Sequence, residues 1–107
     1  MRFMKDLKPL ISILLPVHNS EKYLSDCLES LLSQTFKNIE IVAIDDKSSD
    51  NSYRILNQFK KTDKRIRTYK NVKRYGISVT LNRLLKKSKG NYIAFMDTND
   101  ISSPNRL

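Results

Sequence analysis

The sequence contains few cysteines, few glycines and no long apolar run. Its single cysteine, Cys27, excludes both an intrachain disulfide and a cysteine-based metal cluster. Its only two glycines, Gly76 and Gly90, form neither a GxGxxG motif after a strand nor a P-loop, which argues against a dinucleotide-binding fold. No apolar run approaches the length that crosses a bilayer. The N-terminus lacks the apolar segment of a signal peptide, so we expect a cytoplasmic protein, with the inner face of the membrane as a further option.

Positive charge is in large excess over negative charge. The chain has 20 Lys and Arg against 11 Asp and Glu, a formal net charge of +9, and many of the basic residues fall between Lys60 and Lys89. Such an excess can attract nucleic acid, an anionic membrane surface or a substrate with a diphosphate; a solvated lysine-rich surface is the alternative. Nucleic acid is the least favoured partner, because aromatic stacking platforms and a known docking motif are lacking.

Four apolar segments alternate with three amphipathic segments along the chain. The apolar segments predict strands over residues 11–17, 39–44, 66–69 and 92–96, and the third should lie near an edge because Arg67 interrupts it. The amphipathic segments predict helices over residues 20–32, 50–62 and 77–89, with Ser20 and Asp50 as caps, Cys27 in the core and Gly90 as a terminator. This alternation predicts one α/β domain with a mostly parallel sheet and helices on both of its faces.

Polar side chains follow three of the four predicted strands. The first strand ends in Pro16-Val17-His18-Asn19, the second in residues 45–50 with Asp45 and Asp46, and the fourth in residues 97–100. The carboxyl ends of parallel strands meet at one rim of an open sheet, which is where ligands bind. A concentration of carboxylates on one rim of a basic domain predicts a ligand or a divalent cation there.

Several motifs together resemble the family-two glycosyltransferases of the A-type fold. The matching segments, in the same order as in that family, are residues 13–19, the DDxSxD of residues 45–50, residues 90–97 and residues 100–107. Residues 75–85, with Ser78 and Asn82, resemble members that build bacterial capsule and lipopolysaccharide sugars. The resemblance implies a three-layer, Rossmann-like half-domain of about four strands. It also implies an inverting enzyme that uses a nucleotide-diphosphate sugar, with a UDP-sugar favoured.

The resemblance also implies roles for residues at the strand ends. The first loop matches the one that wraps the base and ribose, and its candidate residues are Pro16, His18, Asn19 and Glu21. Asp45 or Asp46 matches the carboxylate that accepts a hydrogen bond from the base, and Ser48 belongs to the same loop. Asp97 matches the first carboxylate of the DXD motif, which faces the ribose and the sugar. For His18, a purely local role in the turn is the alternative.

The second carboxylate of the DXD motif is replaced here. Asn99 stands at the position that holds Mg²⁺ or Mn²⁺ on the diphosphate in the family, and Asp100 follows it. Two unit charges about 4 Å apart near a surface interact with roughly 4 kcal/mol, so loss of this charge should weaken metal binding unless Asp100 replaces it. Leu81 and Leu84 also depart from the family pattern, standing where many members have arginine and glycine. We interpret Leu81 as a core residue.

The resemblance places the catalytic base beyond this chain. Family members continue through further strands and helices that hold a glycan or lipid-linked acceptor and the base that deprotonates it. We therefore expect residues 1–107 to form a single nucleotide-sugar-binding domain, truncated relative to a full catalytic domain, with no catalytic residue of its own. A catalytically inactive nucleotide-binding or interaction fragment is the alternative.

Two structural expectations follow. The carboxylates of Asp45 and Asp97 should face one shared crevice, sized for a uridine-like ligand, at the rim of the sheet. The outer edge of the fourth strand should be bare, and bare edges favour pairing with another chain, so we expect self-association.

Overall fold

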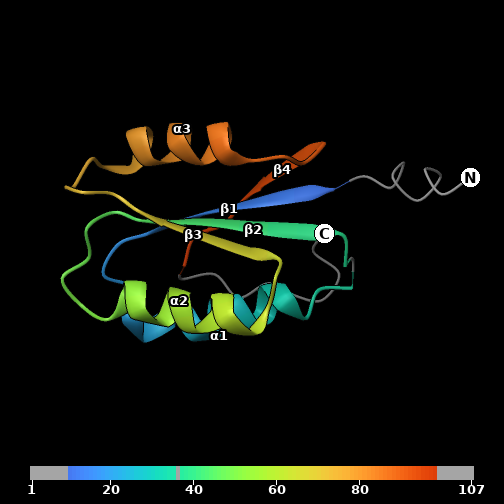
Figure 1. Ribbon diagram of the computed structural model, residues 1–107, viewed down its shortest axis with the longest axis horizontal. Helices are drawn as coiled ribbons and strands as arrows, with labels where there is room; N and C mark the ends of the chain where they lie inside the picture. The colour runs from blue at the N-terminus through green and yellow to red at the C-terminus, as the bar shows by residue number, and fades with distance from the viewer. Residues whose placement is uncertain (1–9, 36, 99–107) are drawn as a thin grey trace, which may run out of the picture.

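The computed structural model describes residues 10–35 and 37–98 (Figure 1). Strands and helices alternate as predicted, in the order β1 (Ile11–Val17), α1 (Glu21–Leu32), β2 (Ile39–Asp45), α2 (Ser52–Thr62), β3 (Ile66–Lys70), α3 (Ile77–Lys87) and β4 (Tyr92–Phe95). The bounds differ slightly from those predicted. β2 and β3 each extend by one polar residue, because Asp45 and Lys70 pair with each other in the ladder. The expected strand end at Met96 is wrong, since β4 ends at Phe95.

The four strands form one fully parallel sheet in the order β3-β2-β1-β4. The first two crossovers, through α1 and α2, carry the chain outward from β1 to β2 and β3. The third crossover, through α3, returns past β2 and β1 to place β4 on the other side of β1 (Figure 1). The strand order therefore reverses between β1 and β4, which is the position where open α/β sheets bind ligands.

The sheet is the middle of three layers. Helices α1 and α2 cover one face and α3 covers the other (Figure 1). Alternate residues of β1 face the two sides: Ile13 and Leu15 pack in the core beneath α1 and α2, whereas Leu14 packs with Leu84 of α3. All seven residues of β2 are buried, as expected for a central strand covered on both faces. This architecture confirms the predicted α/β class with helices on both faces.

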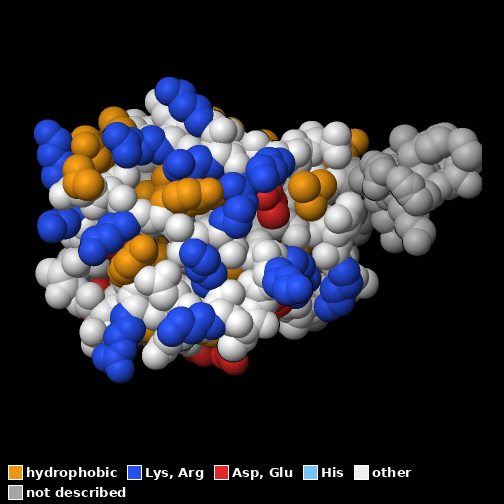
Figure 2. Space-filling model, in the orientation of Figure 1, with side chains coloured by type: hydrophobic (Ala, Val, Ile, Leu, Met, Phe, Trp, Pro, Cys, Tyr) orange, Lys and Arg blue, Asp and Glu red, His pale blue; other side chains and the backbone are white. Residues whose placement is uncertain are grey.

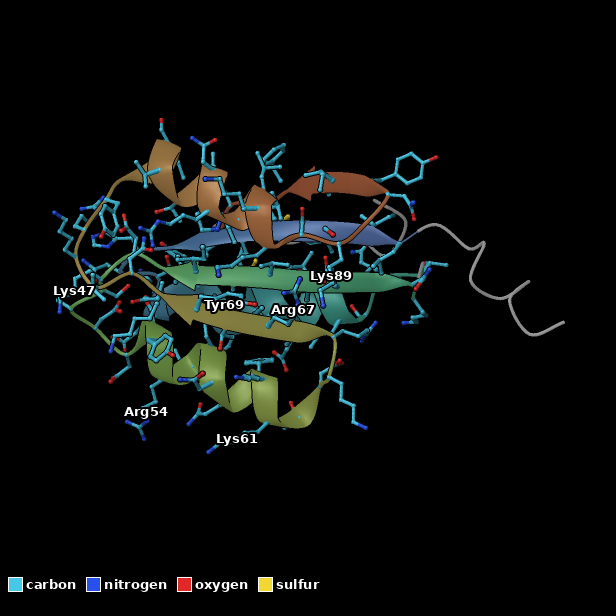
Figure 3. The ribbon with its side chains drawn as sticks, turned by 45° about the horizontal axis from the view of Figure 1, so that its top comes forward. Lys47, Arg54, Lys61, Arg67, Tyr69 and Lys89 are labelled. Carbon is cyan, nitrogen blue, oxygen red and sulfur yellow. The ribbon has the colours of Figure 1, made fainter. Side chains whose placement is uncertain are left out.

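A buried carboxylate ties the end of α3 to the sheet. Glu40 of β2 accepts hydrogen bonds from the Ser12 hydroxyl at 2.5 Å, from the Arg67 guanidinium at 2.7 Å and from the backbone N–H of Lys89 at 2.7 Å. Burial by itself raises the pKa of Glu40, but the hydrogen bonds from Ser12, Lys89 and Arg67 outweigh it and hold the pKa below its ordinary value of 4.5. Figure 3 labels Arg67 and Lys89 on this side of the sheet.

Gly90 does not terminate a helix as predicted. Helix α3 ends at Lys87, with Ser88 in the cap position, and Gly90 lies against β1. A Cβ atom on Gly90 would come within 2.5 Å of the Ser12 hydroxyl oxygen and 2.7 Å of the Leu10 carbonyl oxygen. Glycine is therefore required here by the close approach of two backbone segments.

The two predicted side-chain caps also differ from the structure. Ser20 occupies the cap position of α1 without a side-chain cap hydrogen bond; its hydroxyl donates to the His18 carbonyl instead. Asn51 rather than Asp50 occupies the cap position of α2. Asp50 nevertheless accepts hydrogen bonds from the backbone N–H and the hydroxyl of Ser52, at 2.9 and 2.6 Å. It therefore provides a partner for the N–H of the first residue of α2, although it lies one residue before the cap position.

Among the described residues, β3 and β4 form the two edges of the sheet. β3 is an edge strand, as its arginine predicted, and β4 is paired with β1 alone within this part of the chain. Three large side chains of β4 are exposed: Tyr92, Ile93 and Phe95, at 62, 37 and 54%. The outer edge of the fourth strand is thus bare within the described residues, as expected, whereas self-association remains a prediction.

Candidate functional site

A cavity of about 410 Å³ lies at the carboxyl ends of β1 and β4, where the strand order reverses. The ends of these two strands line one side through Pro16, Val17, His18, Ser20, Phe95, Met96, Asp97 and Thr98. The other side consists of Asp46 after β2 and of residues in and before α3, namely Arg74, Ile77, Thr80 and Leu81. Cavities of this size suit small-molecule ligands.

His18 is held in one orientation beside the cavity. Its Nδ1 lies 2.8 Å from the backbone carbonyl oxygen of Asp46, and its Nε2 lies 3.3 Å from the side-chain nitrogen of Asn19. A carbonyl only accepts hydrogen bonds, so this partner assigns the proton to Nδ1 and leaves Nε2 as an acceptor. His18 therefore offers a fixed, half-buried ring to the cavity.

Asp46 organises the wall of the cavity on the side of α3. Its two carboxylate oxygens accept four hydrogen bonds, from the backbone N–H groups of Tyr75 and Gly76 and from the side chains of Asn71 and Arg74, at 2.8 to 3.2 Å. Burial raises the pKa of Asp46, but these four donors outweigh it and lower the pKa below its ordinary value of 3.8. The loop before α3 is thereby fastened to the end of β2 by one ionised side chain.

Gly76 allows the backbone before α3 to adopt the conformation that binds Asp46. It occupies the cap position of α3 with φ of 90° and ψ of 173°, a conformation essentially restricted to glycine. This geometry turns the N–H of Gly76 toward Asp46 at 2.9 Å and starts α3 beside the cavity.

Asp45 lies close by but does not line the cavity. It is 1% exposed and accepts hydrogen bonds from the backbone N–H of Ser48 at 3.0 Å and from the Ser48 hydroxyl at 2.5 Å. The expectation of a shared crevice therefore holds for Asp97 and fails for Asp45, because the Asp45 carboxylate closes the turn after β2. Asp46 is the member of the pair that faces the cavity.

The loops after β1 and β2 are joined by their polar side chains. Asn19, which has φ of 47°, accepts from the backbone N–H of Ser49 and donates its own N–H to Ser48, both at 2.8 Å. The backbone N–H of Glu21 donates to Asp50 at 3.2 Å. Asn19, Glu21 and Ser48 thus hold the two loops together next to the cavity rather than lining it, and their roles toward a nucleotide stay predictions.

Asp97 and Thr98 border the cavity at the end of β4. Asp97 is exposed, while Thr98 is buried and donates its hydroxyl to Ser20 at 2.9 Å. The two predicted metal ligands, Asn99 and Asp100, lie outside the described residues. Among residues 10–35 and 37–98 there is no group of three His, Cys, Asp or Glu side chains able to hold a metal ion. Of the two described carboxylates at the cavity, Asp46 is fully occupied by its four donors, and Asp97 lies at the exposed border.

Arg74 and the apolar wall of the cavity were not anticipated from the sequence. The Arg74 side chain is 59% exposed and pairs with Asp46 at 3.2 Å, which places a guanidinium at the cavity. Leu81 of α3, predicted as a core residue, is half-buried. It packs against the hydrophobic cluster between α3 and the sheet and also lines the cavity. The one feature of the sequence that could have indicated Arg74 is its position two residues before Gly76, at the start of the predicted helix.

The combination of these groups suits a nucleotide. An apolar wall of Ile77, Leu81 and Phe95 accommodates a flat ring, while Arg74 supplies positive charge for an anionic group and Asp97 supplies a carboxylate for hydroxyls. The fold and the cavity together define a parallel α/β domain with a ligand site at its switch point.

The chain belongs to glycosyl transferase family 2, whose profile matches residues 12–107. It is 38% identical over 101 residues to glycosyltransferase GlyG of Streptococcus pneumoniae, a match that covers 94% of this chain and 34% of GlyG. It is 43% identical over 93 residues to a poly(ribitol-phosphate) beta-glucosyltransferase of Bacillus spizizenii, covering 84% of this chain and 15% of that enzyme. The predicted family is thereby confirmed.

The fold is also found in a solved structure that contains a nucleotide. The structure of S. aureus TarS 1–349 in complex with UDP superposes with a TM-score of 0.81 and 28% sequence identity, over 89% of this chain and 29% of TarS. The chain therefore spans about a third or less of the length of these relatives. Among the described residues, none of the helices is long and apolar enough to cross a membrane.

Proposed function

We propose that this domain binds the nucleotide part of a nucleotide-diphosphate sugar and forms the donor-binding half of an inverting glycosyltransferase. The proposal depends on one observation above all: the cavity lies at the switch point between β1 and β4 and is bordered by Arg74 and Asp97. Membership of glycosyl transferase family 2 and the likeness to TarS bound to UDP support it. A UDP-sugar is the favoured donor.

We assign Asp46 a positioning role and Arg74 a direct one. A carboxylate has about four lone-pair sites, and the four hydrogen bonds of Asp46 occupy them. Asp46 therefore acts by orienting Arg74 and the start of α3. The exposed guanidinium of Arg74 contacts the anionic groups of the ligand, and Asp97 accepts hydrogen bonds from ribose or sugar hydroxyls.

Calorimetric titration of the chain with UDP tests this assignment. We expect Arg74→Ala to weaken UDP binding by about tenfold, because a hydrogen bond to a charged group is lost. Arg54→Ala is the matched control: Arg54 is an exposed arginine of α2 (Figure 3), and its removal should leave the affinity unchanged. Equal affinities for the wild type and Arg74→Ala, or equal losses in both variants, would contradict the proposal.

Divalent metal use is part of the same proposal. Asn99 and Asp100, which lie outside the described residues, would hold Mg²⁺ or Mn²⁺, and the ion would supply positive charge that stabilises the departing diphosphate. Titration of the chain with Mn²⁺ in the presence and absence of UDP measures this directly. We expect Asp100→Asn to weaken the contribution of Mn²⁺ to UDP affinity, because a charged ligand is lost, and an undiminished Mn²⁺ effect in that variant would argue against Asp100 as a ligand.

A catalytically inactive nucleotide-binding or interaction fragment is the second candidate. It is favoured because the described residues at the cavity are assigned binding and positioning roles, and none of them a catalytic one. UDP binding without transfer or hydrolysis of any nucleotide-sugar would select this function. Transfer of a sugar by the chain itself would exclude it.

The acceptor, the location and the assembly state complete the proposal. We propose a glycan or lipid-linked acceptor and a cytoplasmic location, with the inner face of the membrane as a further option. Self-association would proceed through the bare outer edge of β4, where Tyr92 and Phe95 are exposed. A clean monomer in light scattering at high protein concentration would contradict self-association.

A further inference from the structure

The second half of the chain contains a long stretch of basic residues without any carboxylate. Residues 64–96 hold ten basic side chains and no Asp or Glu. This stretch forms β3, α3, β4 and their connecting loops. The ten residues are Lys64, Arg65, Arg67, Lys70, Lys73, Arg74, Arg83, Lys86, Lys87 and Lys89.

Acidic residues of the described chain lie mainly on the opposite side of the sheet. Helix α1 carries three of them, Glu21, Asp26 and Glu29, and Asp50 and Asp63 flank α2. On the α3 side, Glu40 and Asp46 are buried and each is paired with an arginine. Apart from Asp97 at the cavity, the described exposed carboxylates thus avoid α3 and its flanking loops. Figure 2 shows Lys and Arg spread over the face that presents β3 and its neighbours.

The outer face of α3 combines this positive charge with exposed aliphatic side chains. Val79 and Leu85 are each 41% exposed. Val79 and Lys86 are seven residues apart, so they share one face of the helix, and this face points away from the buried residues Thr80 and Leu84. In the loop before α3, Val72 is 79% exposed and precedes the exposed Lys73. Single exposed aliphatic residues need no explanation, but here several lie among lysines in a stretch whose own sequence has no Asp or Glu.

We propose that the outer face of α3 and its flanking loops rest on an anionic lipid bilayer. Lysines near a membrane of anionic lipids are attracted to its surface, and aliphatic side chains gain by entering the boundary between headgroups and acyl chains. Lys73, Lys86 and Lys89 contact the headgroups in this arrangement, while Val79 and Leu85 enter the boundary. A soluble polyanion would use the lysines alone, so the aliphatic residues favour the bilayer.

This orientation places the cavity beside the membrane. Ile77, Thr80 and Leu81 of α3 line the cavity while other residues of the same helix contact lipid. A lipid-linked acceptor would then reach the bound donor without leaving the bilayer. This consequence depends on the proposed function, whereas the membrane contact itself does not and is measurable without any nucleotide.

Vesicle flotation tests the membrane contact. The chain should float with vesicles of phosphatidylcholine and phosphatidylglycerol and remain in solution with vesicles of phosphatidylcholine alone. The double variant Lys86→Glu/Lys89→Glu should lower the vesicle partition coefficient by at least about tenfold, since each lysine near an anionic surface contributes measurably. The matched control is Lys60→Glu/Lys61→Glu in the last turn of α2; it changes the net charge equally and should retain binding within about twofold. Figure 3 labels Lys61 on α2, away from α3.

A second variant separates the bilayer from a soluble polyanion. Val79→Thr/Leu85→Gln keeps the charge, and it should weaken binding to the mixed vesicles while leaving binding to inorganic polyphosphate unchanged. Thermal unfolding of each variant verifies that it is folded. Equal losses in the α2 and α3 charge variants would overturn the proposal in favour of a general charge effect. Unaltered vesicle binding by Val79→Thr/Leu85→Gln would overturn it in favour of a soluble polyanion.

Discussion

Asp46 connects three parts of the chain through one carboxylate. It follows β2, its backbone carbonyl binds His18 from the loop after β1, and its side chain binds the loop that precedes α3. Asp46 is 4% exposed and lies beside the cavity. Its negative charge is therefore stabilised by its hydrogen bonds and by its ion pair with Arg74. At the scale of a single residue, the shape of the ligand site therefore depends on Asp46.

Replacement of Asp46 by asparagine should be strongly destabilising. The amide has one acceptor oxygen, and its NH₂ group would face N–H donors, leaving some of them buried without partners. We expect the free energy of unfolding to fall by about 2 kcal/mol, measured by urea denaturation. Asp26→Asn on the exposed face of α1 is the control and should change stability by less than about 0.5 kcal/mol. Equal effects of the two substitutions would show that Asp46 does not organise the loop.

Sequence patterns indicated the region of the candidate site, but they could not show which residues from other parts of the chain lie beside it. The DDxSxD motif and the strand-end rule directed attention to residues 45–50 and 97, of which Asp46 and Asp97 border the cavity. Whether Asp45 or Asp46 faces the cavity depends on where residues 71–76 lie, and they approach from another part of the chain. Arg74 was missed for the same reason, since its position follows from a hydrogen bond to a residue 28 positions earlier.

Helix α3 shows how one element serves packing and the site together. Its buried residues Thr80 and Leu84 face the sheet, and Leu84 packs with Leu14, Val42 and Ile44. The Leu84 side chain thereby fills the space between the helix and the sheet. The start of the same helix borders the cavity, and its packing therefore supports the site.

Neighbouring leucines of α3 test this packing. Leu84 is fully buried, and Leu85 is 41% exposed. Leu84→Ala should lower the free energy of unfolding by about 3 kcal/mol, because a buried side chain is lost and a cavity remains. Leu85→Ala should cost less than about 1 kcal/mol. Chemical denaturation of both variants gives the comparison, and similar losses would mean that α3 is not packed through Leu84.

The elements themselves were predictable because their apolar residues repeat at the spacing of strands and helices. The bounds were less predictable where polar residues extend an element. Asp45 and Lys70 belong to the sheet because their backbones pair with each other, which no local pattern reveals. Gly90 shows the same limit, because its requirement for glycine comes from the approach of Ser12, far away in the sequence.

The whole molecule is electrically uneven and depends on ionised carboxylates. Four carboxyl groups, Glu40, Asp46, Asp50 and Asp63, have pKa values below their ordinary values. For Asp63 the leading cause is the hydrogen bond from Arg65; for the other three, burial opposes the shift and hydrogen bonds outweigh it. Each group therefore favours the folded state when it is ionised.

Acid should consequently destabilise the protein. Between the lowered pKa values and the ordinary values of 3.8 and 4.5, the unfolded chain binds more protons than the folded one, so stability falls as the pH falls. The contribution of these groups is fully present above about pH 5 and is lost as the pH passes below about 4. Urea midpoints measured from neutral to acidic pH at constant ionic strength should decrease over this range. A midpoint that stays constant would contradict the assigned ionisation.

Strand order was the main feature of the whole fold that the sequence did not predict. The alternation of elements implies parallel crossovers but leaves open whether β4 joins β3 or β1. Its position beside β1 results from α3 crossing the opposite face of the sheet to α1 and α2. The placement of β4 beside β1 creates the switch point, and the cavity forms there.

Nucleotide binding in this cavity can be followed residue by residue by adding UDP to isotope-labelled protein and recording the backbone amide signals by NMR. The signals of Val17, His18, Asp46 and the start of α3 should change, while those of α2 stay unaltered. Changes confined to surfaces away from the cavity, or none at saturating UDP, would show that the cavity is not a nucleotide site.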